Sequence, residues 1–169
     1  MSTKFFNNGL GNTLFDKLKG IASGMATFDR FLAVVGFFRS SGYFKLRKEL
    51  GDISEIKILV GINIDDIFRK HNKALLMLAD EEKAKEIYHN GFKEDIVNAQ
   101  YSPEVEEGIL QMCEDLVSGR LQMRIHATKN LHAKFYLCLP QNHSEHSDGW
   151  VIMGSSNISD SGLGIKQPP

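Results

Sequence analysis

The sequence predicts an α/β fold built on a mixed, mostly parallel β-sheet flanked by helices. Two apolar runs, at 31–38 (FLAVVGFF) and 55–63 (EIKILVGIN), have the length and composition of buried strands, and the first suits a central strand covered on both faces. The segment between them is long enough for a helix, which fits a right-handed crossover between parallel strands. A helical stripe and further strand-like runs follow after residue 102. With 169 residues, the chain can form one domain with a substantial core.

The N-terminal region predicts a short edge strand at 3–6 and an amphipathic helix at about 13–23. Asn12 stands where a helix cap is expected, because its side chain can accept from a free N–H of the first turn. The apolar positions of this helix share one face and are expected in the core: Leu14, Leu18, Ile21 and Ala22.

Polar residues follow the first predicted strand. Arg39, Ser40, Ser41 and Gly42 separate it from a helix that runs to about Leu50. Ligands usually bind at the carboxyl edge of such a sheet, so Arg39 and Ser40 are candidate phosphate-binding residues. The alternative is structural: Ser40 or Ser41 caps the helix and Arg39 is a surface residue.

The middle of the chain predicts two more helices and a third strand. Residues 65–90 have helical character, and Ser102 followed by Pro103 marks the start of a helix that ends near Gly119. Residues 121–127 alternate as a strand does. His126 lies on its polar side, where local hydrogen bonding is a simpler role than a site function.

Two candidate site residues lie in an alternating stretch at 131–139. His132 and Lys134 are two positions apart, so they should point to the same side, opposite the Leu/Phe face. After a polar loop at 141–149, the apolar run at 150–153 predicts a short buried strand that pairs with the first as a hairpin.

The tetrapeptide GSSN, residues 154–157, follows that run directly. Ser156 or Asn157 could cap a following helical turn, whose free N–H groups favour an anion. The preceding loop holds His143 and His146 with carboxylates nearby. A metal site is one interpretation of this loop, and a flexible polar loop is the simpler one.

HxK at 132–134 followed by GSSN at 154–157 resembles the active-site motif of the phospholipase D superfamily. This superfamily includes lipases, metal-independent nucleases and a restriction endonuclease. The stretch GFFRSSGY, at 36–43, looks like the first strand and turn of phospholipase-D-like domains fused to bacterial helicases and restriction enzymes. The resemblance implies a three-layer fold and a single domain over 1–169, the N-terminal fragment of a longer, helicase-like DNA-processing protein.

The resemblance also implies a mechanism without a metal or another cofactor. His132 would attack a phosphodiester and form a phosphohistidine, since imidazole is a competent nucleophile near neutral pH. Lys134 and Asn157 would hold the non-bridging oxygens, and Ser155 or Ser156 would help to position the phosphate. A second histidine would protonate the leaving oxygen. Because the chain has one motif, the implied assembly is a homodimer that brings two copies of His132 together.

One position departs from the family pattern. The family usually has an Asp seven residues after the histidine, where this chain has Leu139. Asp148, placed after an insertion, is the nearest substitute. Family members that act as restriction enzymes tolerate this loss, so the departure indicates a different subfamily rather than lost activity.

Composition narrows the class of protein. The net charge is −1, so nucleic acid would have to bind at a local basic patch. Cys113 and Cys138 have apolar neighbours, which indicates buried thiols in a reducing cytoplasm rather than a disulfide framework. No apolar run approaches the length of a membrane span, and the polar N-terminus is unlike a signal peptide.

The leading hypothesis is therefore a metal-independent nuclease, a hydrolase that acts on DNA within a larger helicase or restriction-type protein. The alternative is a DNA-binding or dimerisation module of a helicase with weak or lost chemistry, which Leu139 and the near-neutral charge favour. A phospholipid enzyme is disfavoured, because nothing resembles a basic amphipathic membrane-binding helix.

Overall fold

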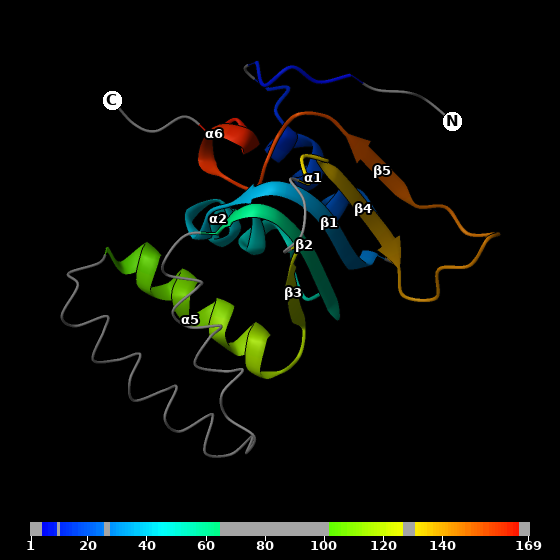
Figure 1. Ribbon diagram of the computed structural model, residues 1–169. Coiled ribbons are helices and arrows are strands. Elements are labelled where there is room, and N and C mark those ends of the chain that lie inside the picture. The colour runs from blue at the N-terminus through cyan, green and yellow to red at the C-terminus, as the bar shows by residue number, and fades with distance from the viewer. Residues whose placement is uncertain (1–4, 10, 26–27, 65–101, 127–130, 166–169) are drawn as a thin grey trace.

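The computed structural model of the chain (Figure 1) describes residues 5–9, 11–25, 28–64, 102–126 and 131–165. Its elements are α1 (Leu14–Gly24), β1 (Phe28–Phe38), α2 (Ser40–Leu50), β2 (Glu55–Ile64), α5 (Pro103–Val117), β3 (Leu121–Ile125), β4 (Phe135–Pro140), β5 (Trp150–Met153) and α6 (Asp160–Leu163). Residues 5 and 6 form no strand, so the edge strand expected at 3–6 is wrong for its described part. The helix predicted at 65–90 lies outside the described residues.

The five strands form one mixed sheet in the order β3-β2-β1-β4-β5. β1, β2 and β3 are parallel, whereas β4 is antiparallel to both β1 and β5. The predicted α/β class and the parallel crossover through α2 are confirmed. Because β4 runs against the other four strands, its start and their ends meet at one edge of the sheet. We call this the carboxyl edge.

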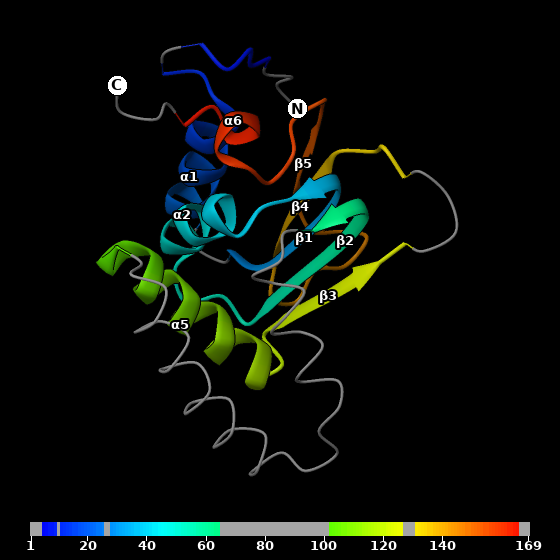
Figure 2. The ribbon, with the colours of Figure 1, turned by 60° about the vertical axis from the view of Figure 1, so that its left-hand side comes forward.

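The described helices lie on one side of the sheet (Figure 2). Buried residues of β1 and β2 alternate along each strand and pack with the apolar faces of α1, α2 and α5. On the opposite sheet face, residues such as Leu32, Val34 and Leu59 are only half-buried. No second helical layer is found among the described residues, so the prediction that β1 is covered on both faces stays a prediction. None of the described helices is both long and apolar enough to span a membrane.

The helices largely follow their sequence signals. The cap of α1 is Thr13 rather than Asn12: its hydroxyl accepts from the Asp16 N–H at 3.0 Å, and Asp16 accepts in return from the Thr13 N–H. The core positions Leu14, Leu18 and Ile21 are buried as expected. α5 starts with Pro103 after Ser102, also as expected.

The hairpin of β4 and β5 is confirmed, but its burial differs from the expectation. Tyr136 and Cys138 are the buried side of β4, while Phe135, Leu137 and Leu139 are half-buried. The register with β1 explains this, because Tyr136 pairs with Ala33 and Cys138 with Phe31, which both face the helices.

β5 was expected to be buried and is instead an edge strand. Its residues Trp150, Val151 and Met153 are exposed, at 43%, 55% and 71% respectively. It is the last strand of the sheet, so no described strand pairs with its outer edge.

Candidate functional site at the carboxyl edge

The two halves of the sequence motif meet at the carboxyl edge. His132 and Lys134 immediately precede β4, and residues 154–157 immediately follow β5. The N–H of Gly154 donates to the carbonyl of Lys134 at 3.3 Å, which joins the two segments directly. The end of β1 also reaches this place, since Phe38 bridges to Ile158.

Asn157 is fixed by the backbone of β1. Its side-chain oxygen accepts hydrogen bonds from the N–H groups of Gly36, at 3.1 Å, and Phe37, at 3.0 Å. These two donors determine the orientation of the amide. The NH₂ group of Asn157 is left as a donor, and no acceptor among the described residues binds it.

Lys134 is a buried cation without a described acidic partner. Its side chain is 5% exposed, and its ammonium donates to the carbonyl of His132 at 2.7 Å. No carboxylate among the residues that the structure describes pairs with it, and burial lowers the pKa of Lys134.

The ammonium and the Asn157 amide border the same small space. A Cβ atom on Gly36 would lie 3.3 Å from Nζ of Lys134 and 3.5 Å from Oδ1 of Asn157. The charged, desolvated ammonium and the side chain of Asn157 therefore border one space, with the amide oxygen as the Asn157 atom next to Gly36 and the NH₂ group as the other end of the same amide. Such an arrangement favours an anion.

His132 is exposed, in contrast to Lys134. The strand expected from 131 begins only at Phe135, so the alternation from which a shared side was expected does not apply to His132 and Lys134. The imidazole is accessible to a ligand, and no side chain within the described ranges hydrogen-bonds to it.

The two serines of the motif differ in their surroundings. Ser155 is exposed, while Ser156 is half-buried and accepts at Oγ from the Asn8 side chain at 3.4 Å. The Ser156 carbonyl accepts from the hydroxyl of Tyr136 at 2.6 Å. The expectation that Ser156 or Asn157 caps the next helix is wrong, since Ser159 caps α6. Asn157 is already engaged with β1.

Arg39 and Ser40 lie close to the same edge. The Arg39 N–H donates to the carbonyl of Ile158 at 2.8 Å, and its guanidinium donates to the carbonyl of Phe38 at 3.2 Å. Ser40 is 1% exposed at the start of α2, so its hydroxyl is enclosed by the fold. The cap position of α2 is Arg39, which corrects the alternative that Ser40 or Ser41 is the cap.

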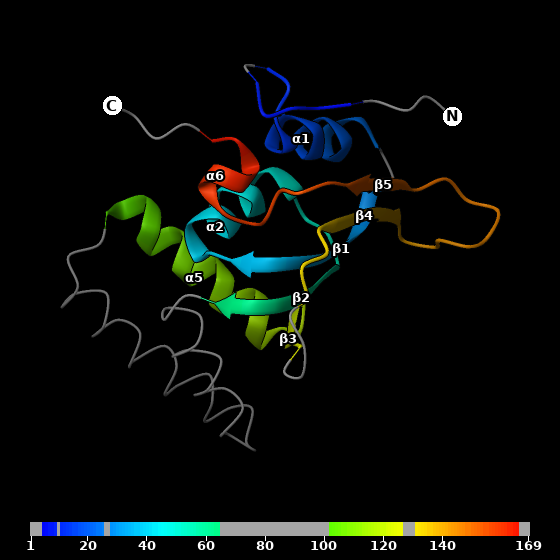
Figure 3. The ribbon, with the colours of Figure 1, turned by 45° about the horizontal axis from the view of Figure 1, so that its top comes forward.

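Asp148 does not substitute for the missing aspartate. It is exposed in the loop between β4 and β5, at the end of the hairpin opposite to residues 132 and 154 (Figure 3). Among the described residues, those of this loop included, no three His, Cys, Asp or Glu side chains gather as metal ligands. His126 lies just after β3, where its N–H donates to the carbonyl of Val60.

Sequence reasoning missed Asn8 and Gly36. Asn8 has a positive φ of 55°, and its side chain donates to Ser156 and accepts from the Leu14 N–H, which ties α1 to the GSSN turn. No local pattern marks this role. Gly36 carried a visible signal, because a glycine inside an apolar strand often marks a close approach of another backbone.

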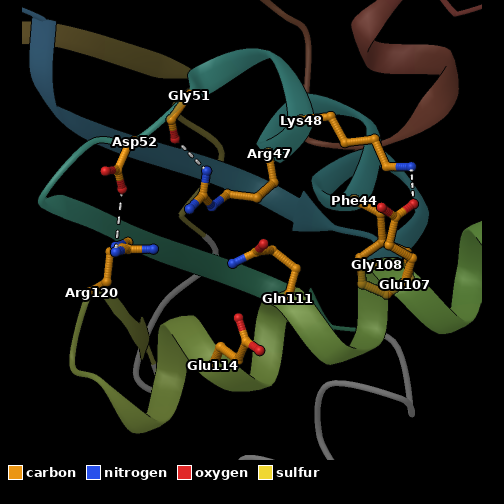
Figure 4. Close-up of a pocket in the computed structure, with 10 residues that line it drawn as sticks. All are labelled: Phe44, Arg47, Lys48, Gly51, Asp52, Glu107, Gly108, Gln111, Glu114 and Arg120. Carbon is orange, nitrogen blue, oxygen red and sulfur yellow. Dashed lines mark hydrogen bonds and ion pairs between the residues drawn. The ribbon is translucent and has the colours of Figure 1, made fainter.

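A separate pocket of about 410 Å³ lies between α2 and α5 (Figure 4). Its wall carries charges that are paired with each other: Lys48 with Glu107, and Arg120 with Asp52. It contains none of the motif residues. We therefore place the candidate site at the carboxyl edge, where a desolvated charge lacks a described counter-ion.

No protein-family model and no curated protein matches this sequence.

Proposed function

We propose that the carboxyl edge is a phosphate site and that the protein is a metal-independent phosphodiesterase acting on nucleic acid, DNA above all. The observation that carries the proposal is the buried ammonium of Lys134, which has no described carboxylate and borders the same space as the side chain of Asn157. A phosphodiester would supply the missing negative charge. The sequence resemblance to the phospholipase D superfamily supports the same assignment, including its three-layer fold.

In the proposed reaction His132 is the nucleophile. An imidazole nitrogen forms a P–N bond, the bond from phosphorus to the leaving oxygen breaks, and that oxygen takes a proton from a general acid. Water then cleaves the P–N bond and releases the phosphate product. Lys134 and Asn157 would stabilise the charge on the non-bridging oxygens, and exposed Ser155 would contact the phosphate.

The general acid is proposed to be His132 of a second copy, in a homodimer. A place within a cytoplasmic helicase or restriction-type protein belongs to the same proposal. Arg39 could approach the phosphate from the end of β1, whereas Ser40 could do so only after its covering residues move.

The second candidate is a nucleic-acid-binding module without chemistry. It is favoured by one observation: no described side chain hydrogen-bonds to the His132 ring, so nothing described orients the imidazole for attack. An anion site made by Lys134 and Asn157 would still bind a phosphate.

The test is cleavage of a labelled DNA oligonucleotide in excess EDTA. Wild type should cleave, and His132→Ala should be inactive yet folded, since this side chain is exposed. His143→Ala, an exposed histidine in the hairpin loop, is the matched control and should keep full activity. Cleavage by His132→Ala at the wild-type rate would refute the mechanism. Binding without cleavage by the wild type would favour the second candidate.

A further inference from the structure

Two strand glycines lie directly under the segment that carries His132 and Lys134. A Cβ atom on Gly61 of β2 would lie 2.1 Å from the carbonyl oxygen of Leu131, and one on Gly36 of β1 would lie 3.5 Å from the same oxygen. The first separation is impossible for real atoms. The segment at 131–134 therefore occupies space that any side chain at Gly61 would fill.

The sheet is irregular at the same place. Val35 pairs with Val60, but Phe37 pairs with Asn63, so β2 has one more residue than β1 across this interval. Such a bulge bends the strands locally. Gly36 and Gly61 lie within it, which brings the end of the sheet and the Leu131 backbone together.

Hydrogen bonds and close contacts connect these two glycines with Lys134 and Asn157. The carbonyl of His132, one residue after Leu131, accepts from the Lys134 ammonium at 2.7 Å. That ammonium and the Asn157 oxygen both border Gly36, whose own N–H binds Asn157. The absence of two side chains thus leaves room for the backbone before His132 and for the ammonium of Lys134.

We propose that Gly36 and Gly61 are positioning residues of the phosphate site: they seat the 131–134 segment on the sheet and so set where Lys134 and His132 lie. That the site binds phosphate rests on the proposed function. That the two glycines determine the position of Lys134 does not, and it can be tested separately. Gly36 leaves space for the ammonium of Lys134. Gly61 lets the Leu131 backbone, just before His132, approach the sheet closely.

The test uses the full chain and two variants. Gly36→Ala introduces a methyl group 3.3 Å from Nζ, a close contact that a flexible lysine can relieve by moving. We expect a folded protein in which the side-chain NMR signal of Lys134 and its pH titration change. Affinity for inorganic phosphate should fall about tenfold, the effect of one weakened charged hydrogen bond.

Gly61→Ala forces the Leu131 carbonyl away and should displace His132. If the wild type is active, this variant should lose about 10²-fold in kcat with a smaller change in KM, because a misplaced nucleophile slows the chemical step more than binding. If it does not fold, Gly36→Ala alone decides the question.

Gly108→Ala is the control for general destabilisation. Its added Cβ meets Phe44 at 2.4 Å between α2 and α5, away from the motif, so it should lower stability without altering the Lys134 signal. If Gly36→Ala leaves the Lys134 signal and the phosphate affinity unchanged, the proposal that the glycines position Lys134 is refuted. If the Lys134 signal of Gly36→Ala changes but the wild type neither binds phosphate nor cleaves DNA, the positioning role of the glycines is supported and the proposed function is wrong.

Discussion

Lys134 has lost most of its hydration, and its single described hydrogen bond goes to a carbonyl. Desolvating an ammonium in this way costs free energy that a ligand can recover by supplying charge. A residue that weakens the fold while serving a site is a common compromise in functional proteins.

Lys134→Met should therefore stabilise the free protein, on the order of 1 kcal/mol, while abolishing phosphate binding. Chemical denaturation with and without phosphate measures both effects. A loss of stability in this variant would show that the ammonium contributes more through its hydrogen bond than it costs through burial.

The same lysine predicts a pH dependence. Burial lowers its pKa below the ordinary 10.5 in the folded state, so between the two values the unfolded chain binds more protons than the folded protein. Stability should rise with pH across this interval in wild type, relative to Lys134→Met. Denaturation curves for both proteins over a pH series that runs up to the ordinary pKa of 10.5 provide the comparison, and parallel curves would contradict the prediction.

Asn157→Asp tests the donor role of the amide. A carboxylate keeps an oxygen for the N–H groups of Gly36 and Phe37, but it replaces the free NH₂ donor with an acceptor and adds a negative charge beside Lys134. We expect an intact fold and at least a tenfold loss of phosphate affinity. Titration with inorganic phosphate measures it, and unchanged affinity would remove Asn157 from the site.

At the scale of single elements, local signals predicted most of the fold. The apolar runs predicted β1 and β2, and the Ser-Pro pair predicted the start of α5. Burial could not be predicted so well, because alternation alone does not say which side of a strand faces the helices. In β4 the pairing of Tyr136 with Ala33 decides that question, and pairing is a property of the assembled sheet.

The sequence predicted which segments form the candidate site, but not the surroundings of their side chains. The spacing of His132, Lys134 and Asn157 identified the segments that meet at the carboxyl edge. Their environments were not predictable, since the burial of Lys134 depends on Gly36 and Asn157, which are distant in sequence. The cap of α1 was also not predicted correctly. Asn12 and Thr13 are both good capping residues, and the capping box with Asp16 selects Thr13.

The crossing of α2 and α5 depends on a glycine. Gly108 lies so close to Phe44 that an added Cβ would meet the ring at 2.4 Å. Gly108→Ala should destabilise by about 1–3 kcal/mol through overpacking. Gly20→Ala in α1, where an added Cβ meets nothing, should stabilise by up to about 1 kcal/mol. Thermal unfolding of the pair measures the contrast, and equal effects would contradict the packing argument.

At the scale of the whole molecule, one buried carboxylate connects three elements. Asp115 of α5 is fully buried and accepts from Arg47 of α2 at 2.6 Å, from Arg120 before β3 at 3.0 Å and from the hydroxyl of Tyr43 at 3.0 Å. Breaking such a network leaves buried charges without partners, which is far more costly than losing an exposed ion pair.

Asp115→Asn should accordingly lose about 3–5 kcal/mol of stability. Lys48→Ala, which removes the exposed pair of Lys48 with Glu107, should change stability by less than about 1 kcal/mol. Denaturant titration of both variants gives the comparison. Similar small losses would mean that the helical packing, rather than this network, holds α2 to α5.

The exposed edge of β5 limits how two copies can associate. A strand that pairs with its own copy across a two-fold axis does so antiparallel, which would join the two described sheets into one and turn the two carboxyl edges in opposite directions. The two copies of His132 would then lie on opposite edges of the joined sheet. Edge-to-edge pairing through β5 and a shared two-histidine site are therefore mutually exclusive geometries, and a dimer of the first kind would be inert in the proposed reaction.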